Sequence, residues 1–165
     1  WRGGWFHTGD VVRMDQTGMV YLVDRKKNII RRAGENIAAA EVEACLLAHE
    51  KVKQVAAIAA PDELREEEVM ACVILKPGFE GDEETASELF DWCFERMSYF
   101  KAPGWLKFFD ELPMTSTQKI EKRSIFGADF NPETTPGIHD FRSRKRRPNA
   151  TGVSRNRRSP YDARS

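Results

Sequence analysis

The sequence predicts a small α+β domain with a short antiparallel or mixed sheet flanked by helices. Runs of β-branched residues alternate with two amphipathic stretches of helix length. These elements do not follow a strict strand–helix–strand repeat, which would indicate a parallel α/β fold. At 165 residues, the chain is long enough for one domain with a hydrophobic core.

The first part of the chain predicts a β-hairpin and one further strand. Residues 11–15 and 19–23 are strand-like runs. Gly18 between them suits the left-handed position of a short hairpin loop. Residues 29–32 predict another short strand, which ends at a turn over residues 34–36.

The middle of the chain predicts a helix followed by two paired strands. Residues 38 to 50 carry apolar side chains at helical spacing and contain neither Gly nor Pro. Residues 52–60 and 69–75 are β-branched runs on either side of an acidic loop. We therefore expect them to form an antiparallel pair.

A second helix and two short elements complete the predicted domain. Residues 84–100 predict a helix with an aromatic inner face. Its apolar residues recur at steps of three and four, and they are Leu89, Phe90, Cys93, Phe94, Met97 and Phe100. Residues 106–109 predict a last strand, and residues 122–126 predict a last turn of helix.

Charge is distributed unevenly, although the net charge is zero. Residues 1–141 hold 17 Lys and Arg against 25 Asp and Glu, whereas residues 142–165 hold 9 basic residues and one acid. We predict a basic, disordered tail over residues 131–165. A solvated tail is favoured over a nucleic-acid-binding arm, because Tyr161 alone among the last residues could stack on a base.

The composition also bears on the cellular compartment. No apolar run approaches the ~20 residues of a membrane span, and the start shows no signal segment. Cys45, Cys72 and Cys93 are widely spaced and odd in number, so they predict buried, reduced thiols. We therefore expect a soluble, cytoplasmic protein.

Four short patches carry the most specific information in the sequence. They are GWFHTGD at residues 4–10, DRKKNII at 24–30, GENI at 34–37 and LPMTSTQKI at 112–120. In this order the four patches resemble motifs of the adenylate-forming ligases. The form of these motifs is closest to that of carnitine/crotonobetaine-type and fatty-acyl-CoA ligases. Because the chain begins at Trp1, directly before the first patch, we interpret it as a fragment.

The resemblance implies an architecture and a reaction. Residues 1–24 would end a large AMP-binding domain that is otherwise missing, and residues 25–130 would form a C-terminal lid domain. The implied activity is acid–thiol ligation, in which a small carboxylate, ATP and CoA give acyl-CoA, AMP and pyrophosphate. Mg²⁺ is implied as well, with ligands outside this chain. The fragment alone is expected to be inactive.

The resemblance also assigns nucleotide contacts and a hinge. Asp10 is implied to bind the ATP ribose, since a carboxylate accepts from two vicinal hydroxyls. Arg25 is implied to bind the nucleotide through a guanidinium that stays charged. Lys27 is implied to be the hinge about which the lid turns. The alternatives are a turn-capping role for Asp10 and a solvated charged turn for the two basic residues.

Lys119 is implied to be the catalytic lysine of adenylation. Its ammonium would bridge the substrate carboxylate and the α-phosphate, where negative charge develops. Gln118 stands where most members of the family have Gly before this lysine. An ordinary surface lysine is the alternative.

Three residues are implied to contact CoA. Gly34 and Glu35 would line the tunnel for the pantetheine arm, because a glycine lets a ligand pass close to the backbone. Lys101 matches a region where relatives hold CoA phosphates, although a lysine before a turn is also ordinary. No metal ligands are predicted, since His49 and His139 lack metal-ligand spacing.

Two other functions stay open at this point. One is a free-standing lid fragment that acts as a non-catalytic interaction module through its basic end. The other is a luciferase-like or peptide-synthetase adenylation module. A carrier-protein domain after the lid would indicate the second alternative, and the basic tail offers none.

Overall fold

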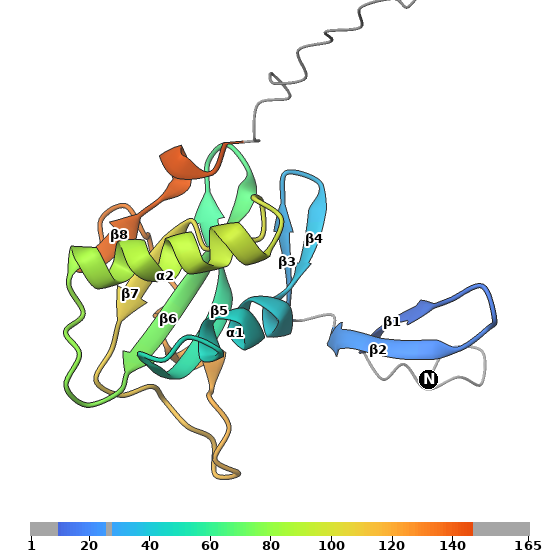
Figure 1. The fold of residues 1–165 in the computed structure, drawn as a ribbon, viewed down its shortest axis with the longest axis horizontal. Coiled ribbons are helices and arrows are strands. Elements are labelled where there is room, and N and C mark those ends of the chain that lie inside the picture. The colour runs from blue at the N-terminus through green and yellow to red at the C-terminus, as the bar shows by residue number, and fades with distance from the viewer. Residues whose placement is uncertain (1–9, 26–27, 147–165) are drawn as a thin grey trace, which may run out of the picture.

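The fold is known from a computed structural model, which describes residues 10–25 and 28–146 (Figure 1). Most of the predicted elements are present. In chain order the elements are β1 (Asp10–Met14), β2 (Val20–Arg25), β3 (Ile29–Arg32), β4 (Glu35–Ala38), α1 (Ala39–Leu47), β5 (Val52–Asp62), β6 (Glu66–Leu75), α2 (Glu83–Arg96), β7 (Trp105–Phe108), the 3-10 helix η2 (Lys122–Ser124), β8 (Ile138–Asp140) and the 3-10 helix η3 (Arg142–Arg144). Within the described ranges, no helix has the length and apolarity needed to cross a bilayer.

One mixed sheet of six strands forms the body of the domain. Its order is β4-β3-β6-β7-β8, and β5 pairs with β6 along nearly the whole length of both strands. The β6–β7 pair is parallel, and the other pairs are antiparallel. This architecture confirms the predicted α+β fold and the antiparallel pairing of the two β-branched runs.

Strand β6 is buried on both faces, which explains its continuous apolar run. Its residues at positions 69, 71 and 73 face one core, together with apolar residues of α1 and α2. The residues at 70, 72 and 74 face a second core, which is closed by the segment after β7. Figure 1 shows α1 and α2 lying across the sheet. A central strand with two covered faces shows no alternation of polar and apolar residues.

The two helices are shorter than predicted. Helix α2 begins at an N-cap, Asp82, whose carboxylate accepts a hydrogen bond from the backbone N–H of Thr85 at 2.8 Å. It ends before Met97, where the backbone becomes extended with φ −134°. Met97 and Phe100 still pack against the core from the following turn, so their apolar spacing continued the helical pattern beyond the helix.

Strand β4 was not predicted, because residues 34–36 were interpreted as a turn. The actual turn is shorter. Ala33 and Gly34 both have positive φ, at 48° and 83°, as a two-residue hairpin loop of type I′ requires. The chain therefore reverses within two residues, and Glu35 already pairs with Arg32.

The predicted disorder of residues 131–165 was wrong for residues 131–146. Strand β8 pairs with β7. Phe141 is buried, and its ring centroid lies 4.9 Å from that of Phe90. The physical reason is that Phe141, Ile138 and the buried Lys145 anchor a segment whose other side chains are mostly polar. Residues 147–165, the remainder of the predicted tail, lie outside the described residues.

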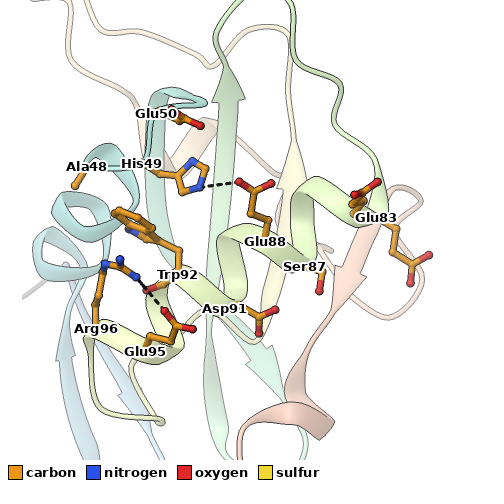
Figure 2. A pocket seen from close by; sticks show the side chains of 11 residues that line it. Ala48, His49, Glu50, Glu83, Ser87, Glu88, Asp91, Trp92, Glu95 and Arg96 are labelled. Carbon is orange, nitrogen blue, oxygen red and sulfur yellow. Dashed lines mark hydrogen bonds and ion pairs between the residues drawn. The ribbon is translucent and has the colours of Figure 1, made fainter.

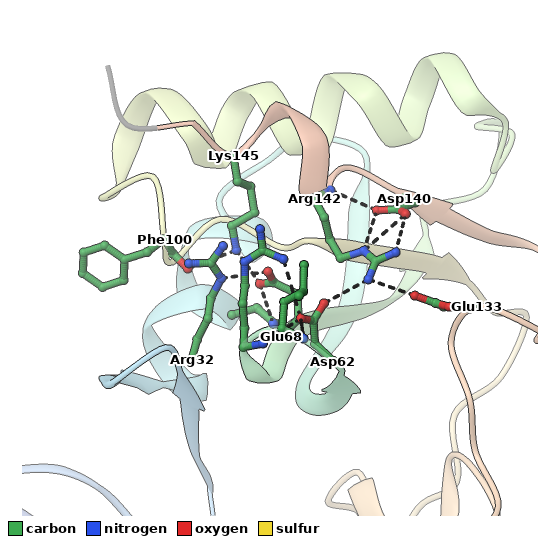
Figure 3. Close-up of polar contacts among 11 residues, drawn as sticks. Arg32, Asp62, Glu68, Phe100, Glu133, Asp140, Arg142 and Lys145 are labelled. Atoms are coloured by element: carbon green, nitrogen blue, oxygen red, sulfur yellow. Dashed lines mark hydrogen bonds and ion pairs between the residues drawn. The ribbon is translucent and has the colours of Figure 1, made fainter. Parts of the chain in front are cut away.

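A buried ionic cluster holds this C-terminal segment to the sheet (Figure 3). The Glu68 carboxylate, which is fully buried, accepts from Arg32 Nε at 2.7 Å and from Lys145 Nζ at 2.5 Å. Lys145 Nζ also donates to the Phe100 carbonyl at 3.0 Å. Burial lowers the pKa of Lys145 to about 8. Gly104 lies so close to Glu68 that a Cβ would overlap its side chain, so this position requires glycine.

Replacing Lys145 by Met is expected to destabilise the domain by about 3–5 kcal/mol, because Glu68 then keeps a buried charge with one partner fewer. Urea unfolding measures the change. Arg146→Met is the matched control: this neighbouring basic side chain is exposed, so its loss should change the free energy of unfolding by less than about 0.5 kcal/mol. Equal effects of the two substitutions would contradict a structural role for the cluster.

Candidate functional site

Residues 113–121 form a tight hairpin that carries Lys119. Met114 and Ile120 form an isolated antiparallel bridge. The Thr115 N–H donates to the Lys119 carbonyl at 2.7 Å, and the Glu121 N–H donates to the Pro113 carbonyl at 2.7 Å. Next to the hairpin, Leu112 is buried in the second core. The backbone at Lys119 is therefore held in place by hydrogen bonds on both sides.

The Lys119 side chain is exposed, and its ammonium has no hydrogen bond or ion pair with any other described residue. Lys122, three positions further on, differs in this respect. Its ammonium forms an ion pair with Glu43 at 2.6 Å. Of these two lysines, Lys119 is the one whose charge can serve a ligand.

The turn before Lys119 has a backbone conformation that favours glycine. Gln118 has φ +62°, in the left-handed region that favours glycine. The turn is closed by a hydrogen bond from the Gln118 N–H to the Thr115 carbonyl at 3.0 Å. Gln118 keeps the geometry of the glycine turn at the cost of backbone strain.

Replacing Gln118 by Gly is expected to stabilise the chain by about 0.5–1 kcal/mol, because relief of the strain exceeds the added freedom of the unfolded chain. Thermal unfolding measures the change. Ser116→Gly is the control, because Ser116 lies in the same loop with φ outside the left-handed region. This control should be destabilising. A loss of stability at both positions would show that Gln118 is not strained.

The β3–β4 turn, which carries Gly34, is exposed. A Cβ built on Gly34 would meet no atom within 4 Å, and the side chain of Glu35 is exposed as well. Figure 1 shows this turn at one end of the sheet and the hairpin of residues 113–121, in orange, at the opposite end. The structure therefore does not bring Gly34 and Lys119 together.

Lys101 is engaged with another side chain. Its ammonium forms an ion pair with both carboxylate oxygens of Glu41, at 2.8 and 2.9 Å. Glu41 lies in the first turn of α1. A contact between Lys101 and a CoA phosphate stays a prediction, and it requires this ion pair to open.

The nucleotide-binding candidates lie on the first hairpin. Asp10 and Arg25 are directly opposite each other in the register of β1 and β2, so the fold brings the two backbones together. Their side chains and the hinge candidate Lys27 lie outside the described residues.

A groove that was not predicted from the sequence lies between the end of α1 and α2 (Figure 2). Its volume is about 1070 Å³, and most of its polar lining is acidic. His49 lies at its edge, with Nε2 3.2 Å from a Glu88 oxygen and its ring 5.0 Å from that of Trp92. His49 is thus buried, and its ring nitrogen has a partner in Glu88. Over residues 10–25 and 28–146, no three His, Cys, Asp or Glu residues are arranged to hold a metal ion.

Residues 41–119 match the family model of the AMP-binding enzyme C-terminal domain. Crotonobetaine/carnitine–CoA ligase from Salmonella arizonae is 37% identical over 74% of this chain and 23% of the ligase. A probable CoA ligase from Humulus lupulus, CCL11, is 40% identical over 74% of the chain and 22% of that protein. The chain therefore spans less than a quarter of the length of these relatives.

Solved structures agree with this match. The o-succinylbenzoate CoA synthetase of Bacillus subtilis, in complex with its acyl-adenylate intermediate, superposes with a TM-score of 0.68 and 32% identity. This match covers 78% of the chain and 25% of the synthetase. An anthranilate CoA ligase in complex with anthranoyl-AMP gives a TM-score of 0.65 and 34% identity over 73% of the chain and 23% of the ligase. The chain belongs to the AMP-binding, adenylate-forming enzyme family, of which it carries the C-terminal domain.

Proposed function

We propose that the chain is the lid of an ATP-dependent acyl-CoA ligase, which converts a carboxylate, ATP and CoA into acyl-CoA, AMP and pyrophosphate. The supporting observation is the placement of Lys119 and Gly34. Lys119 is exposed, has no partner among the described residues, and lies on a hydrogen-bonded hairpin at one end of the sheet. The β3–β4 turn, with free space beside Gly34, lies at the other end (Figure 1). One lid can serve two half-reactions by presenting these two ends to one site in turn.

In the first half-reaction, Lys119 is the catalytic residue. Its ammonium contacts the carboxylate and the α-phosphate as the acyl-adenylate forms, and it stabilises the negative charge that develops there. Asp10 and Arg25 hold the ATP ribose and the nucleotide from adjacent strands. Lys27 is the hinge that lets the lid turn between the two steps.

In the second half-reaction, the β3–β4 turn faces the active site. The backbone at Gly34 and the neighbouring Glu35 line the path of the pantetheine arm, and the CoA thiol displaces AMP from the acyl-adenylate. Lys101 contacts a CoA phosphate after leaving Glu41. The open space around Gly34 supports this role.

The partner of the lid is a large AMP-binding domain. The β1–β2 hairpin exposes apolar side chains, with Val12, Met14, Met19 and Val20 each more than half exposed. A two-stranded hairpin of this kind needs a covering surface for stability, and the large domain supplies it. The Mg²⁺ ligands and the acyl pocket lie in that domain. Three unpaired thiols fit a cytoplasmic enzyme.

The isolated chain is expected to release no pyrophosphate from ATP and a carboxylate, because a lid alone supplies neither a phosphate-binding loop nor an acyl pocket. A coupled pyrophosphate assay on the purified chain measures this. Adding the large domain as a separate polypeptide should restore exchange of pyrophosphate into ATP. Pyrophosphate release by the chain alone would contradict the assignment as a lid, and failure of the pair to exchange would contradict the assignment as a ligase.

A further inference from the structure

The groove between the end of α1 and α2 carries more negative charge than its surroundings neutralise. Its lining holds one guanidinium, that of Arg96, and six carboxylates, which belong to Glu50, Glu83, Glu84, Glu88, Asp91 and Glu95. The last three of these form ion pairs with basic side chains. The first three form no ion pair with any other described residue. The groove therefore has free carboxylates at its α1 end and at the start of α2.

Two guanidinium groups already lie against the lining of this groove. The Arg96 guanidinium lies 3.4 Å from the centre of the Trp92 ring. Arg144 donates to the Ser87 hydroxyl at 2.7 Å and to the Asp91 carboxylate at 2.5 Å. Figure 2 shows Trp92, Ser87 and Asp91 among the lining side chains. Because a guanidinium both pairs with carboxylates and stacks on aromatic rings, this lining suits arginine.

The sequence that follows the described residues is rich in arginine and starts beside the groove. Arg144, which contacts the groove, lies two positions before Arg146, the last described residue. Residues 147–165 contain five Arg, no Lys and one acid. Nineteen residues can span roughly 60 Å when extended, whereas the 14 residues of α2 extend over about 21 Å. Residues 147–165 are therefore long enough to reach every part of the groove.

We propose that residues 147–165 dock in this groove of the same molecule, so that the groove is an intramolecular interaction surface for the basic end of the chain. The arginines of this segment pair with the carboxylates that have no partner, and they continue the contact that Arg144 begins at Ser87 and Asp91. The charges of the two parts match. Residues 1–141 have eight more acidic than basic residues, and residues 142–165 have eight more basic than acidic ones.

Covalent attachment makes this docking favourable, although each exposed ion pair is weak by itself. Residues 147–165 follow directly on a segment that is held at the rim of the groove, and a short flexible connection gives a local concentration on the order of millimolar. Several weak pairs then act together. The contact needs no ligase activity, so it can be tested independently of the proposed function.

The test compares backbone amide signals of the ¹⁵N-labelled 165-residue chain with those of a triple variant in which Arg155, Arg157 and Arg158 are each replaced by Gln. We expect the signals of groove residues to shift between the two proteins at low salt. At 1 M NaCl the difference should disappear, because the Debye length is then about 3 Å. Arg123→Gln is the matched control. Arg123 is an exposed arginine of η2 and does not line the groove, so its loss should leave the groove signals unchanged.

Substitutions in the groove complete a double-mutant cycle. In a chain that carries Glu50→Gln, Glu83→Gln and Glu84→Gln, the triple arginine substitution should cause much smaller shifts of the groove signals. Unchanged groove signals in the arginine variant at low salt, or equal shifts with and without the three carboxylates, would overturn the proposal. Shifts that grow with protein concentration would also overturn it, because they would place the contact between two molecules. Signals of core residues such as Phe90 show in each sample that the domain is folded.

Discussion

In the proposed full-length ligase, Lys119→Ala is expected to slow acyl-adenylate formation by a factor on the order of 10²–10³, the usual cost of removing one preorganised charged contact. The thioester step, started from supplied acyl-adenylate and CoA, should keep most of its rate. The reason is that the hairpin of residues 113–121 and the β3–β4 turn lie at opposite ends of the sheet in Figure 1. Exchange of pyrophosphate into ATP measures the first step, and CoA thioester formation measures the second.

Lys122→Ala is the matched control for this experiment. Lys122 lies three residues away, but its charge is paired with Glu43 at 2.6 Å. Its removal should change adenylation far less than the removal of Lys119. If Lys119→Ala slowed both half-reactions equally, or if Lys122→Ala had the larger effect on adenylation, Lys119 would not be the catalytic lysine.

Gly34→Leu is expected to impair the other half-reaction. A leucine side chain would occupy the open space beside the turn, where the pantetheine arm is proposed to pass. CoA thioester production should fall by about 10²-fold, as expected when a bound group is displaced from its productive position. Exchange of pyrophosphate into ATP should stay near that of the parent enzyme.

Gly34→Ala separates the effect of bulk from that of strain. Gly34 has φ +83°, so Ala and Leu both strain the turn, by about 1–2 kcal/mol. Only Leu adds a bulky side chain. Thioester formation should therefore be lower in the Leu variant than in the Ala variant at similar melting temperatures. Loss of both half-reactions in a well-folded Leu variant would show that this turn does not serve the thioester step alone.

Local patterns in the sequence were sufficient for the longer elements. The β-branched runs of β5 and β6 predicted their antiparallel pairing, and the three- and four-residue spacing of apolar residues predicted α2. These patterns work because burial of one face, or of both faces for β6, repeats along many residues. Short elements carry too few repeats for this, and the strands Glu35–Ala38 and Ile138–Asp140 were missed.

The residues of the candidate site could be predicted from local sequence, but their contacts could not. Lys119, Gly34 and Lys101 were identified from short motifs, since each lies in or beside a turn with a recognisable local sequence. Their surroundings were not predictable. The ion pair of Lys101 joins it to Glu41, 60 positions earlier in the chain. Only the structure shows that Lys101 is paired, whereas the Lys119 ammonium has no partner among the described residues.

The sequence by itself therefore determined the α+β class, the central apolar strands and the identity of the candidate catalytic loop. Only the tertiary structure decided which charges are paired, and that residues 138–144 form a strand and a 3-10 helix. Glu68 and Lys145 are 77 positions apart, and the stacked rings of Phe90 and Phe141 come from helix α2 and from the segment after β8. Their contacts arise because β6 and its neighbouring strands bring distant segments to one place, and a pattern that repeats every two or four residues contains no information about such distant pairs.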